Sequence, residues 1–492
     1  MLSMTLPTFE ALQMFQTEYS IVPIYREIFS DRITPISLLQ TLASYSSQYY
    51  LLESVEGGKN WARYSFLGFD PVLELRCKNN QIQIKREDTI EKKTGDPNKV
   101  IREILAEYRS PKLKNLPPFT GGFVGYFAYE YMKYHESAIQ FNSKESGDFQ
   151  DVELMLFHKV IAFDHFRQKL IVIVNISTED FEQSYLKGSQ QLEEIIAMIR
   201  EGKQAEISPL RLQTELKSVF SKEDYEEGVR KIQHHIHEGD IFQAVLANQQ
   251  KAKATGSLLN MYRVLRTTNP SPYMVYMKTS DVEIACSSPE TLIRLQNQEL
   301  STFPIAGTRP RGKTSEEDEQ LIEQLLKDEK ELSEHHMLVD LARNDLGKIC
   351  RFGTIEVKKM REILKFSHVL HMATTVTGKI KDSLDPLDAI GAALPAGTLS
   401  GAPKIRACQI IDELENTRRG VYGGAIGYID FTGNTDTCIG IRLAVKKDDV
   451  VYVQSGAGIV KDSVPEKEFE ECNNKAGAII DALKQSEGMF DE

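Results

Sequence analysis

The sequence predicts an α+β fold in which helices pack on antiparallel β-sheets. Short β-rich runs broken by turns fill the segment from about Val22 to Val174. The last third of the chain places several strands close together between single helices. Strands that follow one another directly favour antiparallel pairing, because a regular βαβ unit would place a helix between each pair of strands.

Composition and charge exclude several classes of protein. The 492 residues are 41% hydrophobic and 26% charged, as in an ordinary globular protein of two or three domains. The net charge of -12 argues against a nucleic-acid-binding surface, since phosphate contacts need clustered lysine and arginine. No apolar run approaches the roughly 20 residues of a membrane helix, and Met1–Glu18 lacks the pattern of a signal peptide.

The six cysteines are scattered without CxxC or Cys/His spacing, which argues against a zinc site and against a disulfide framework. We therefore expect a cytoplasmic protein with reduced core thiols and no nucleic-acid or membrane partner.

The chain divides into two regions joined by a polar segment. A predicted strand at Lys169–Val174 closes the first region, residues 16–175. Residues 201–221 have neither sustained periodicity nor apolar mass, so we interpret them as a linker. An amphipathic helix at Glu223–Glu238 opens the second region, residues 222–482.

An acidic segment, Glu316–Gly347, has the pattern of one long helix. Gly347 supplies a stop signal. Glu331 and Glu334 are three residues apart and project from the same face. The apolar stripe of this helix consists of Leu321, Leu325, Leu332 and Val339.

A second pair with the same spacing, Glu468 and Glu471, lies in a predicted helix behind the capping-box pattern Ser463–Glu466. Two carboxylate pairs on two helices could hold one Mg²⁺, which prefers oxygen ligands and keeps waters for an anionic substrate. The alternative is a pair of solvated, charged helix faces.

Several segments have the chemistry of carboxylate binders. Arg442 lies in a predicted strand, Cys438–Lys446, on the face opposite the large aliphatic residues. Gly456-Ala457-Gly458 follows the next predicted strand, Val450–Gln454, and could aim backbone N–H groups at an anion. A lone Gly-Ala-Gly is more often a tight turn, and Arg442 could equally lie on a solvated strand face.

Two further small-residue loops present N–H groups to an anion: Gly397–Lys404, which runs into a predicted helix at Pro403–Leu414, and Pro304–Gly312, which carries two arginines. His371 is a candidate proton carrier near neutral pH, although a single histidine is more often packed in a core. A cation together with several carboxylate binders suits a small dicarboxylate.

In this combination and order, the motifs resemble those of the chorismate-utilising enzymes. The whole chain, to about Ala482, is similar to the large subunits of anthranilate synthases. The matching segments are Pro304–Gly312, Glu331–Gly347, Gly397–Lys404, Tyr422-Gly423-Gly424, Arg442 and Gly456–Gly458. The resemblance implies antiparallel sheets stacked as a sandwich with helices outside. It also implies conversion of chorismate and ammonia to anthranilate and pyruvate, the first step of tryptophan biosynthesis.

The resemblance also assigns roles to residues. It implies Mg²⁺ ligands at Glu334 and Glu471, with Glu331 and Glu468 in support. The implied chorismate contacts are Gly307, Thr308, Tyr422, Arg442, Gly456, Ala457 and Gly458. The implied catalytic residues are Glu290, which would protonate the departing 4-hydroxyl, and His371 and Thr398, which would line the ring.

A second set of segments resembles the feedback tryptophan site of the family. Its matching residues are Ser54, Pro272, Tyr273 and Met274. The chain has Ala247-Asn248-Gln249 where the family usually shows Ser-Gln-Arg, a departure that bears on the strength of inhibition.

Partners and rival activities also follow from the resemblance. Thr437-Cys438-Ile439-Gly440 lacks the rest of a glutaminase nucleophile site, so the family implies a separate glutamine amidotransferase subunit in a heterotetramer. The rival readings are an aminodeoxychorismate synthase and a catalytically silent tryptophan-binding regulator. Ala306 and Gln243 stand where lysines serve related enzymes as nucleophile or base.

Overall fold

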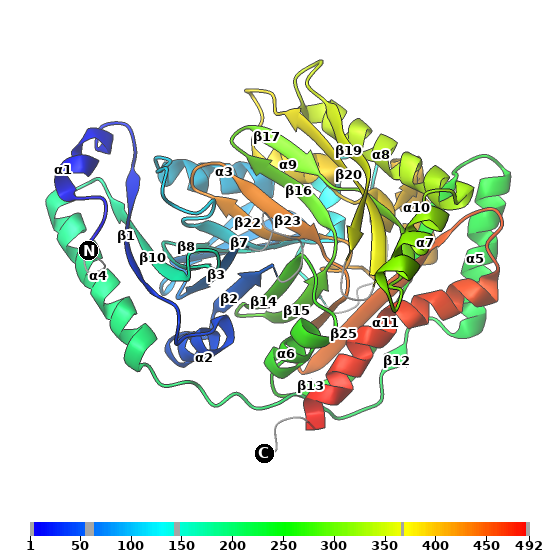
Figure 1. The fold of residues 1–492 in the computed structure, drawn as a ribbon, viewed down its shortest axis with the longest axis horizontal. Coiled ribbons are helices and arrows are strands. Elements are labelled where there is room, and N and C mark those ends of the chain that lie inside the picture. Colours follow the sequence, from blue (N-terminus) through cyan, green and yellow to red (C-terminus); the bar gives the residue numbers. More distant parts are fainter. Residues whose placement is uncertain (1–3, 55–62, 142–147, 366–368, 489–492) are drawn as a thin grey trace.

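The computed structural model describes residues 4–54, 63–141, 148–365 and 369–488. Its main strands form two large antiparallel sheets (Figure 1). The first sheet has the order β1 (Ile21–Phe29), β10 (Lys169–Ser177), β9 (Lys159–Asp164), β3 (Tyr64–Phe69), β2 (Tyr49–Glu53), β14 (Tyr273–Lys278), β15 (Val282–Ser288), β24 (Leu443–Lys447), β25 (Val450–Ile459), β13 (Gln243–Thr255) and β11 (Arg211–Leu212). Two short strands also pair with β13: β12 (Lys217–Ser218) and β21 (Gly401–Ala402).

The second sheet has the order β18 (Ile305–Pro310), β20 (Val369–Lys379), β17 (Glu299–Thr302), β16 (Thr291–Gln296), β23 (Thr435–Ile439), β22 (Ala425–Asp430), β7 (Gly122–Phe127), β8 (Val152–Phe157), β4 (Leu73–Lys78), β5 (Gln81–Arg86) and β6 (Thr89–Thr94). β19 (Glu356–Lys365) pairs with β20 beside this path.

The two sheets pack face to face through one apolar layer. Side chains of both sheets meet in it, among them Tyr50 and Ile284 from the first sheet and Val124 and Met155 from the second. Burial of this layer removes apolar surface of both sheets from water, which is the main favourable term in their association. The predicted sandwich of antiparallel sheets is confirmed.

Helices cover the outer faces of the sandwich (Figure 1). Over the first sheet lie α2 (Pro35–Tyr45), α4 (Phe181–Glu201), α6 (Leu259–Thr268) and α11 (Pro465–Gly488). Over the second sheet lie α3 (Pro97–Glu107), α8 (Glu329–Ile349) and α9 (Pro386–Ala393). α5 (Lys222–His237) and α10 (Lys404–Leu414) pack beside β13 and β25.

Short helical turns complete the described chain: α1 (Phe9–Leu12), η1 (Gln13–Phe15), η2 (Tyr129–Tyr134) and η3 (Gly397–Leu399). The remaining helix is α7 (Ser315–Leu325). Across the described residues, none of the helices is both long enough and apolar enough to cross a bilayer.

Both predicted regions contribute strands to both sheets. β2 of the first region pairs with β14 of the second, with Glu53 opposite Met274. β7 pairs with β22 in the other sheet, with Gly122 opposite Asp430. The polar segment 201–221 contributes β11 and β12, which both pair with β13.

The acidic segment forms two helices, so the prediction of one long helix is wrong. α7 ends at Leu325 and α8 begins at Glu329. Between them Asp328 caps α8, because its carboxylate accepts hydrogen bonds from the N–H groups of Lys330 (3.1 Å) and Glu331 (3.2 Å). α8 then continues to Ile349, so Gly347 does not end it.

The predicted strand Cys438–Lys446 is also wrong, because this segment passes from one sheet to the other. β23 ends at Ile439 in the second sheet and β24 begins at Leu443 in the first. At the crossing, the N–H of Ile441 donates to the C=O of Ile439 at 2.9 Å, and Arg442 has the left-handed φ of 50°. Gly440 is required there, since a Cβ would lie 2.2 Å from the carbonyl oxygen of Val421.

Two glycine segments predicted as loops are parts of strands. Gly456-Ala457-Gly458 belongs to β25. Pro304–Gly312 contains β18, whose register against β20 shifts between Ala306 and Thr308. Gly307, with φ of 77°, occupies this bulge, where a left-handed residue is typical.

Candidate active site

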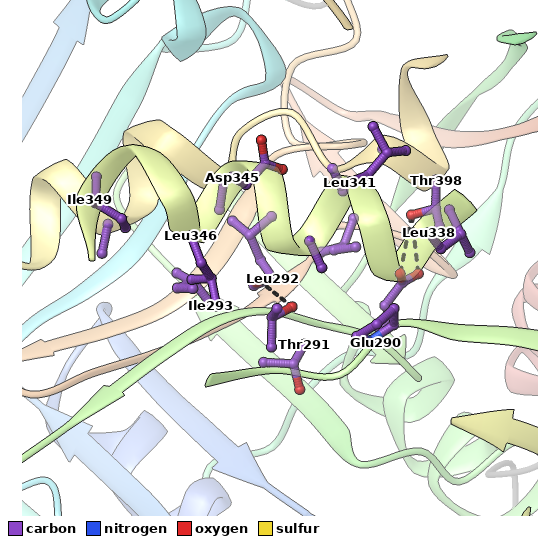
Figure 2. A pocket seen from close by; sticks show the side chains of 18 residues that line it. Glu290, Thr291, Leu292, Ile293, Leu338, Leu341, Asp345, Leu346, Ile349 and Thr398 are labelled. Atoms are coloured by element: carbon purple, nitrogen blue, oxygen red, sulfur yellow. Dashed lines mark hydrogen bonds between the residues drawn. The ribbon is translucent and has the colours of Figure 1, made fainter. Parts of the chain in front are cut away.

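Glu290 and Thr398 point toward each other at the end of a small cavity (Figure 2). Glu290 lies between β15 and β16, and Thr398 lies in the η3 turn. The Thr398 hydroxyl is 3.2 and 3.3 Å from the two carboxylate oxygens of Glu290. The cavity, of about 60 Å³, continues along α8 past Leu338 and Leu341.

The surroundings of Glu290 suit a proton donor. Burial raises the pKa of its carboxyl group to about 7, against the lowering effects of the Thr398 hydrogen bond and the positive charge of Arg442. A carboxyl group that titrates near neutral pH exists partly as the acid there, which is the state that a general acid needs. Glu290 is therefore not the solvated strand-end carboxylate that its sequence alone favours.

Arg442 faces Glu290 from the crossing between the sheets. Burial lowers the pKa of its guanidinium, and the nearby Glu290 opposes that effect. The backbone carbonyl of Arg442 accepts a hydrogen bond from the N–H of Ser287 at 3.0 Å, which fixes the crossing beside β15. Arg442 is half-buried beside Glu290 and does not lie on a solvated strand face, so its guanidinium is suited to a carboxylate.

His371 lies on β20 with 9% of its surface exposed. Burial lowers the pKa of its imidazole, the charge of Arg442 lowers it further, and a backbone hydrogen bond with Gly307 acts in the opposite direction. A neutral imidazole can accept a proton, so the group is suited to be a base rather than a cation. The side chain of Thr308, which is opposite His371 in the ladder, lies outside the described part of the structure.

The β25 segment presents two backbone amides away from its partner β13. Gly456 pairs with Ala247 and Gly458 with Val245. The N–H of Ala247 donates to Glu415 at 2.8 Å, and that of Val245 donates to the Ser400 carbonyl at 2.8 Å. In an antiparallel ladder, paired residues whose N–H groups point outward on one strand point outward on the other as well.

The amides of Gly456 and Gly458 are thus directed away from β13, whereas Ala457 pairs with Leu246 and has its N–H in the ladder. Tyr422 is buried at 5% exposure directly ahead of Gly423, whose φ is 74°. Among the glycine-strand residues expected to bind chorismate, the geometry favours the two glycine amides over that of Ala457.

The predicted carboxylate pairs on α8 and α11 lie close enough to repel one another. Burial raises the pKa of Glu334, and the charges of Glu331 and then Glu471 raise it further. Burial also raises the pKa of Glu468, with the Ser463 hydrogen bond lowering it and the charge of Glu471 raising it. Repulsion of this kind is relieved by a cation.

Two carboxylates of the cluster, Glu331 and Glu471, already have a cationic partner. Glu331 accepts a hydrogen bond from Arg309 at 3.0 Å, and Glu471 forms an ion pair with Lys475 at 2.7 Å. Within the described ranges, no three His, Cys, Asp or Glu side chains are arranged to hold a metal ion. The donor set consists of carboxylate oxygens alone, which fits a hard divalent cation such as Mg²⁺.

The glycine bulge connects this cluster with the Arg442 side of the site. A Cβ at Gly307 would lie 3.4 Å from Oε2 of Glu331 and 3.3 Å from the methyl group of Met372. The bulge therefore lies directly against the carboxylate cluster, while its backbone contacts His371.

A second cavity, of about 220 Å³, is lined by all four residues that the sequence groups as a tryptophan site: Ser54, Pro272, Tyr273 and Met274. β2 and β14 pair side by side at its wall. Glu53, next to Ser54, is held by the Tyr262 hydroxyl at 2.7 Å and by the Arg266 guanidinium at 2.9 Å.

The sequence analysis missed two charged residues at this second cavity, Arg294 on β16 and Asp436 on β23. They form an ion pair of 2.8 Å, and Asp436 also accepts a hydrogen bond from the Tyr273 hydroxyl at 2.7 Å. The available signal was one arginine inside the otherwise apolar run Thr291–Leu295, since buried charges need a partner.

A sequence model of the family described as chorismate binding enzyme matches residues 48–481. The chain belongs to the chorismate-binding enzymes. This assignment agrees with the convergence of Glu290, His371, Arg442 and the two carboxylate pairs around one region of the sandwich.

Sequence relatives narrow the position of the chain among chorismate-binding enzymes. The anthranilate synthase component 1 of Acetivibrio thermocellus is 43% identical, over 98% of this chain and 99% of that protein. The protein of the same name from Aquifex aeolicus is 40% identical, again over 98% of this chain and 99% of that protein.

Two solved structures have the same fold. The anthranilate synthase component I of Streptococcus pneumoniae superposes with a TM-score of 0.76 at 35% identity, covering 86% of this chain and 94% of that one. The menaquinone-specific isochorismate synthase of Escherichia coli superposes with a TM-score of 0.69 at 20% identity, covering 96% of this chain and 98% of that one. The second likeness concerns the fold alone.

Proposed function

We propose that this chain is the catalytic large subunit of an anthranilate synthase, which converts chorismate and ammonia to anthranilate, pyruvate and water. The observation that carries the proposal is the half-buried Glu290, whose pKa is raised to about 7 beside the hydroxyl of Thr398 and the guanidinium of Arg442. Relatives named anthranilate synthase component 1, at 43% and 40% identity over 98% of this chain, support the same conclusion.

Substrate orientation follows from the charges of the site. Arg442 and the outward amides of Gly456 and Gly458 suit one carboxylate of chorismate. Mg²⁺ held by Glu334 and Glu471, with Glu331 and Glu468 acting mainly through water, would receive the ring carboxylate and draw electron density from the ring.

The first step is an addition with loss of water. Ammonia adds at C2, the diene electrons shift, and the 4-hydroxyl leaves with the proton of Glu290. The ammonium proton released from the new amine returns the carboxyl group to its acid form, so the step is balanced. Thr398 holds the carboxyl group by the hydrogen bond of 3.2 Å to one of its oxygens.

The second step is an elimination that makes the ring aromatic. A base takes the C2 proton and the C3–O bond breaks. The enolpyruvyl group leaves and takes up a proton at its methylene carbon to become pyruvate. His371 is suited to assist because burial and Arg442 lower its pKa and keep the imidazole neutral. Aromatisation makes this step strongly downhill.

Two positions favour ammonia as the nucleophile. Ala306 is buried at 7% exposure on β18 and offers only a methyl group. Gln243 lies beside Gly458 of β25, since a Cβ at Gly458 would be 3.2 Å from the Nε2 atom of Gln243. Neither side chain can attack C2 or act as a base toward water.

We further propose that L-tryptophan inhibits from the cavity lined by Ser54, Pro272, Tyr273 and Met274. Its apolar strands and its Arg294–Asp436 pair suit an amino acid with a large apolar side chain. A glutamine amidotransferase subunit, component II of a cytoplasmic heterotetramer, would supply the ammonia. The component 1 names of the relatives support a partner subunit.

The deciding experiment supplies the purified chain with chorismate, Mg²⁺ and an ammonium salt, and follows anthranilate by fluorescence and products by mass spectrometry. We expect anthranilate and pyruvate in equal amounts. A 4-amino product would favour an aminodeoxychorismate synthase, and no turnover together with tryptophan binding would favour a silent regulator. Either result would overturn the proposal.

A further inference from the structure

A buried ion pair lies behind the proposed substrate site, on the side of β13 away from β25. Arg419 is 2% exposed and Glu415 is 4% exposed. The guanidinium donates to both carboxylate oxygens, Nε to Oε2 at 2.8 Å and Nη2 to Oε1 at 2.6 Å. Two parallel hydrogen bonds of this kind fix the geometry of a pair as well as its charge.

The remaining donors of Arg419 bind two backbone carbonyls from different elements. Nη1 donates to the carbonyl of Leu399, in the η3 turn next to Thr398. Nη2 donates to the carbonyl of Val245 on β13 at 2.8 Å. Arg419 therefore links the turn that contains Thr398 with β13, the strand that pairs with Gly456 and Gly458 of β25.

Glu415 fixes β13 at a second point. Its Oε1 accepts the N–H of Ala247 at 2.8 Å, and Ala247 is the residue opposite Gly456. Val245, which binds Arg419, is opposite Gly458. The ion pair thus binds the carbonyl of Val245 and the N–H of Ala247, which both point away from β25. Their partners on β25, Gly458 and Gly456, direct their amides toward the proposed substrate.

Arg419 is itself rigidly supported. Its backbone N–H and that of Gly420 donate to the buried carboxylate of Glu130 at 2.8 and 3.1 Å. Its guanidinium lies 4.5 Å from the ring centre of Tyr129 and 5.9 Å from that of Tyr422. Five donors in a planar fork make these contacts possible, and a lysine ammonium cannot reproduce them together.

We propose that Arg419 is a positioning residue, which with Glu415 holds the Thr398 turn and the Gly456–Gly458 strand in fixed relation and so controls turnover without touching chorismate. The inference rests on the proposed function, because it takes Thr398, Gly456 and Gly458 as the groups that meet the substrate. Displacement of such groups by about 1 Å can cost a factor of roughly a hundred in rate.

The test compares Arg419→Lys with Arg418→Lys, a neighbouring arginine whose partners are Asn79 and Asp151. For Arg419→Lys we expect kcat to fall by about tenfold or more, with a raised KM for chorismate, in a protein that remains folded by circular dichroism. Arg418→Lys should keep both constants within about twofold of the parent, since its contacts lie outside the site.

A pH profile separates positioning from a merely structural effect. The Thr398 hydrogen bond lowers the pKa of Glu290, so a displaced turn should move the alkaline limb of kcat to higher pH. Thr398→Val should move the limb in the same direction and serves as the reference. A folded Arg419→Lys with an unshifted limb and kcat within twofold of the parent would overturn the inference.

Glu415→Gln is the second variant, used if Arg419→Lys does not fold. It retains an acceptor for Ala247 but loses the charge that fixes the guanidinium. We expect a smaller upward shift of the same limb, and no shift would count against the inference. Absence of anthranilate with the wild-type chain would instead refute the proposed function, so the two failures are distinguishable.

Discussion

The hydroxyl of Tyr273 lies 2.9 Å from the hydroxyl of Thr291, and this contact joins the walls of the two cavities. Tyr273 lines the larger cavity, and Thr291 lines the smaller one next to Glu290. Because the Tyr273 hydroxyl donates its proton to Asp436, it must accept the proton of Thr291. A change at Tyr273 can therefore reach Thr291, which directly follows Glu290, the proposed acid.

Thr291→Val should weaken the coupling between tryptophan and catalysis. Removal of the hydroxyl breaks the contact with Tyr273 and keeps the volume of the side chain, so we expect tryptophan to bind with similar affinity but to inhibit less. Couplings of this type amount to about 1–3 kcal/mol. Calorimetry of tryptophan binding and inhibition curves measure the two effects, with Thr377→Val on β20 as control. Unchanged inhibition would remove Thr291 from the coupling.

Ser54→Phe should fill part of the larger cavity and relieve inhibition without abolishing catalysis. Ser54 lines that cavity at the end of β2, and a cavity of about 220 Å³ cannot hold both the added ring and an amino acid with a large side chain. The tryptophan concentration for half inhibition measures the effect. Ser47→Phe, at an exposed serine ahead of β2, is the matched control. Equal sensitivity of the Ser54 variant and the parent would place the inhibitor elsewhere.

Glu334→Gln should weaken Mg²⁺ binding and sharply reduce turnover while the fold survives. The substitution removes one formal charge from the cluster in which burial and then the charge of Glu331 raise the pKa of Glu334, and it replaces a carboxylate ligand by a weaker amide oxygen. Apparent affinity for Mg²⁺ can be measured by isothermal titration as well as by activity. Glu323→Gln, at an exposed glutamate on α7 paired with Lys327, should leave both unchanged. Near-parental Mg²⁺ affinity in the Glu334 variant would contradict the metal assignment.

The pH profile should show the acid form of Glu290. Because the folded pKa of this carboxyl group is about 7, the fraction that carries the proton falls as the pH rises through neutrality, and kcat should fall with it. The measurement holds the concentration of unprotonated ammonia constant. Glu290→Gln should lose most of the turnover and the associated limb. Persistence of the limb in this variant would assign it to another group.

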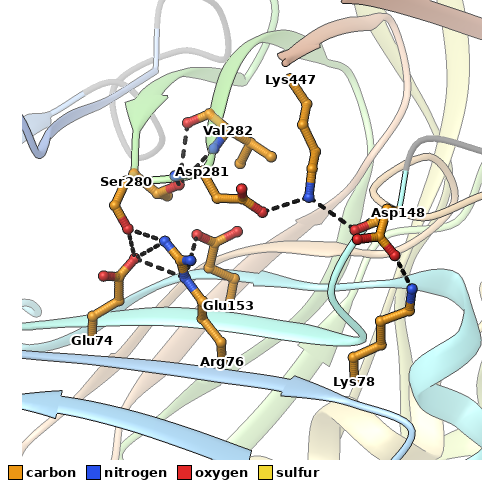
Figure 3. Close-up of polar contacts among 10 residues, drawn as sticks. Glu74, Arg76, Lys78, Asp148, Glu153, Ser280, Asp281, Val282 and Lys447 are labelled. Carbon is orange, nitrogen blue, oxygen red and sulfur yellow. Dashed lines mark hydrogen bonds and ion pairs between the residues drawn. The ribbon is translucent and has the colours of Figure 1, made fainter. Parts of the chain in front are cut away.

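Glu153 on β8 should make stability depend on pH. It is 0% exposed, and Figure 3 shows it next to Arg76 and Glu74 of the second sheet and to the Ser280–Val282 turn of the first. Arg76 is 3.4 Å away, and Asp281 of the turn binds Lys447 at 2.6 Å.

Burial raises the pKa of Glu153 to about 7, with Arg76 lowering it and Glu74 and Asp281 raising it further. A folded pKa above the unfolded value of 4.5 means that folding favours the protonated form. Stability should therefore fall as the pH rises from about 4.5 to about 7, by on the order of 3 kcal/mol, and then stay level.

Glu153→Gln should remove this dependence. Its thermal midpoint should exceed that of the parent at about pH 8 and approach it at about pH 5, by the sign of the pKa shift. Glu107→Gln, at an exposed glutamate paired with Arg86, provides the comparison. A midpoint difference that is the same at both pH values would show that Glu153 does not titrate in this range.

Residue patterns predicted most single elements but not the places where the chain changes sheet or caps a helix. Amphipathic periodicity correctly indicated α5 and α10, and the two glutamate pairs lie together as their helical spacing suggested. The alternation through Cys438–Lys446 gave no sign of the crossing, because β23 and β24 each keep a period of two and only three residues, which end at the left-handed Arg442, separate them.

The break at Asp328 was missed for a similar reason, since the leucine stripe of the acidic segment continues on both sides of the cap. The enclosure of Glu290 by Thr398 and the contacts of Arg419 with Leu399 and Val245 join distant segments, and the sequence of each segment does not contain them. The family resemblance predicted a role for Glu290, which the local pattern did not. It predicted no role for Arg419.

Each sheet contains strands from both regions of the chain, and this constrains how the protein folds during its synthesis. β2 needs β14, and β7 needs β22, with Gly122 opposite Asp430. While the chain leaves the ribosome, β7 therefore has an unpaired edge until residue 430 has been synthesised. Unpaired edges and late, long-range pairings expose a nascent chain to aggregation. A cut between the two regions would separate β2 from β14 and β7 from β22, so each piece would keep unpaired strand edges.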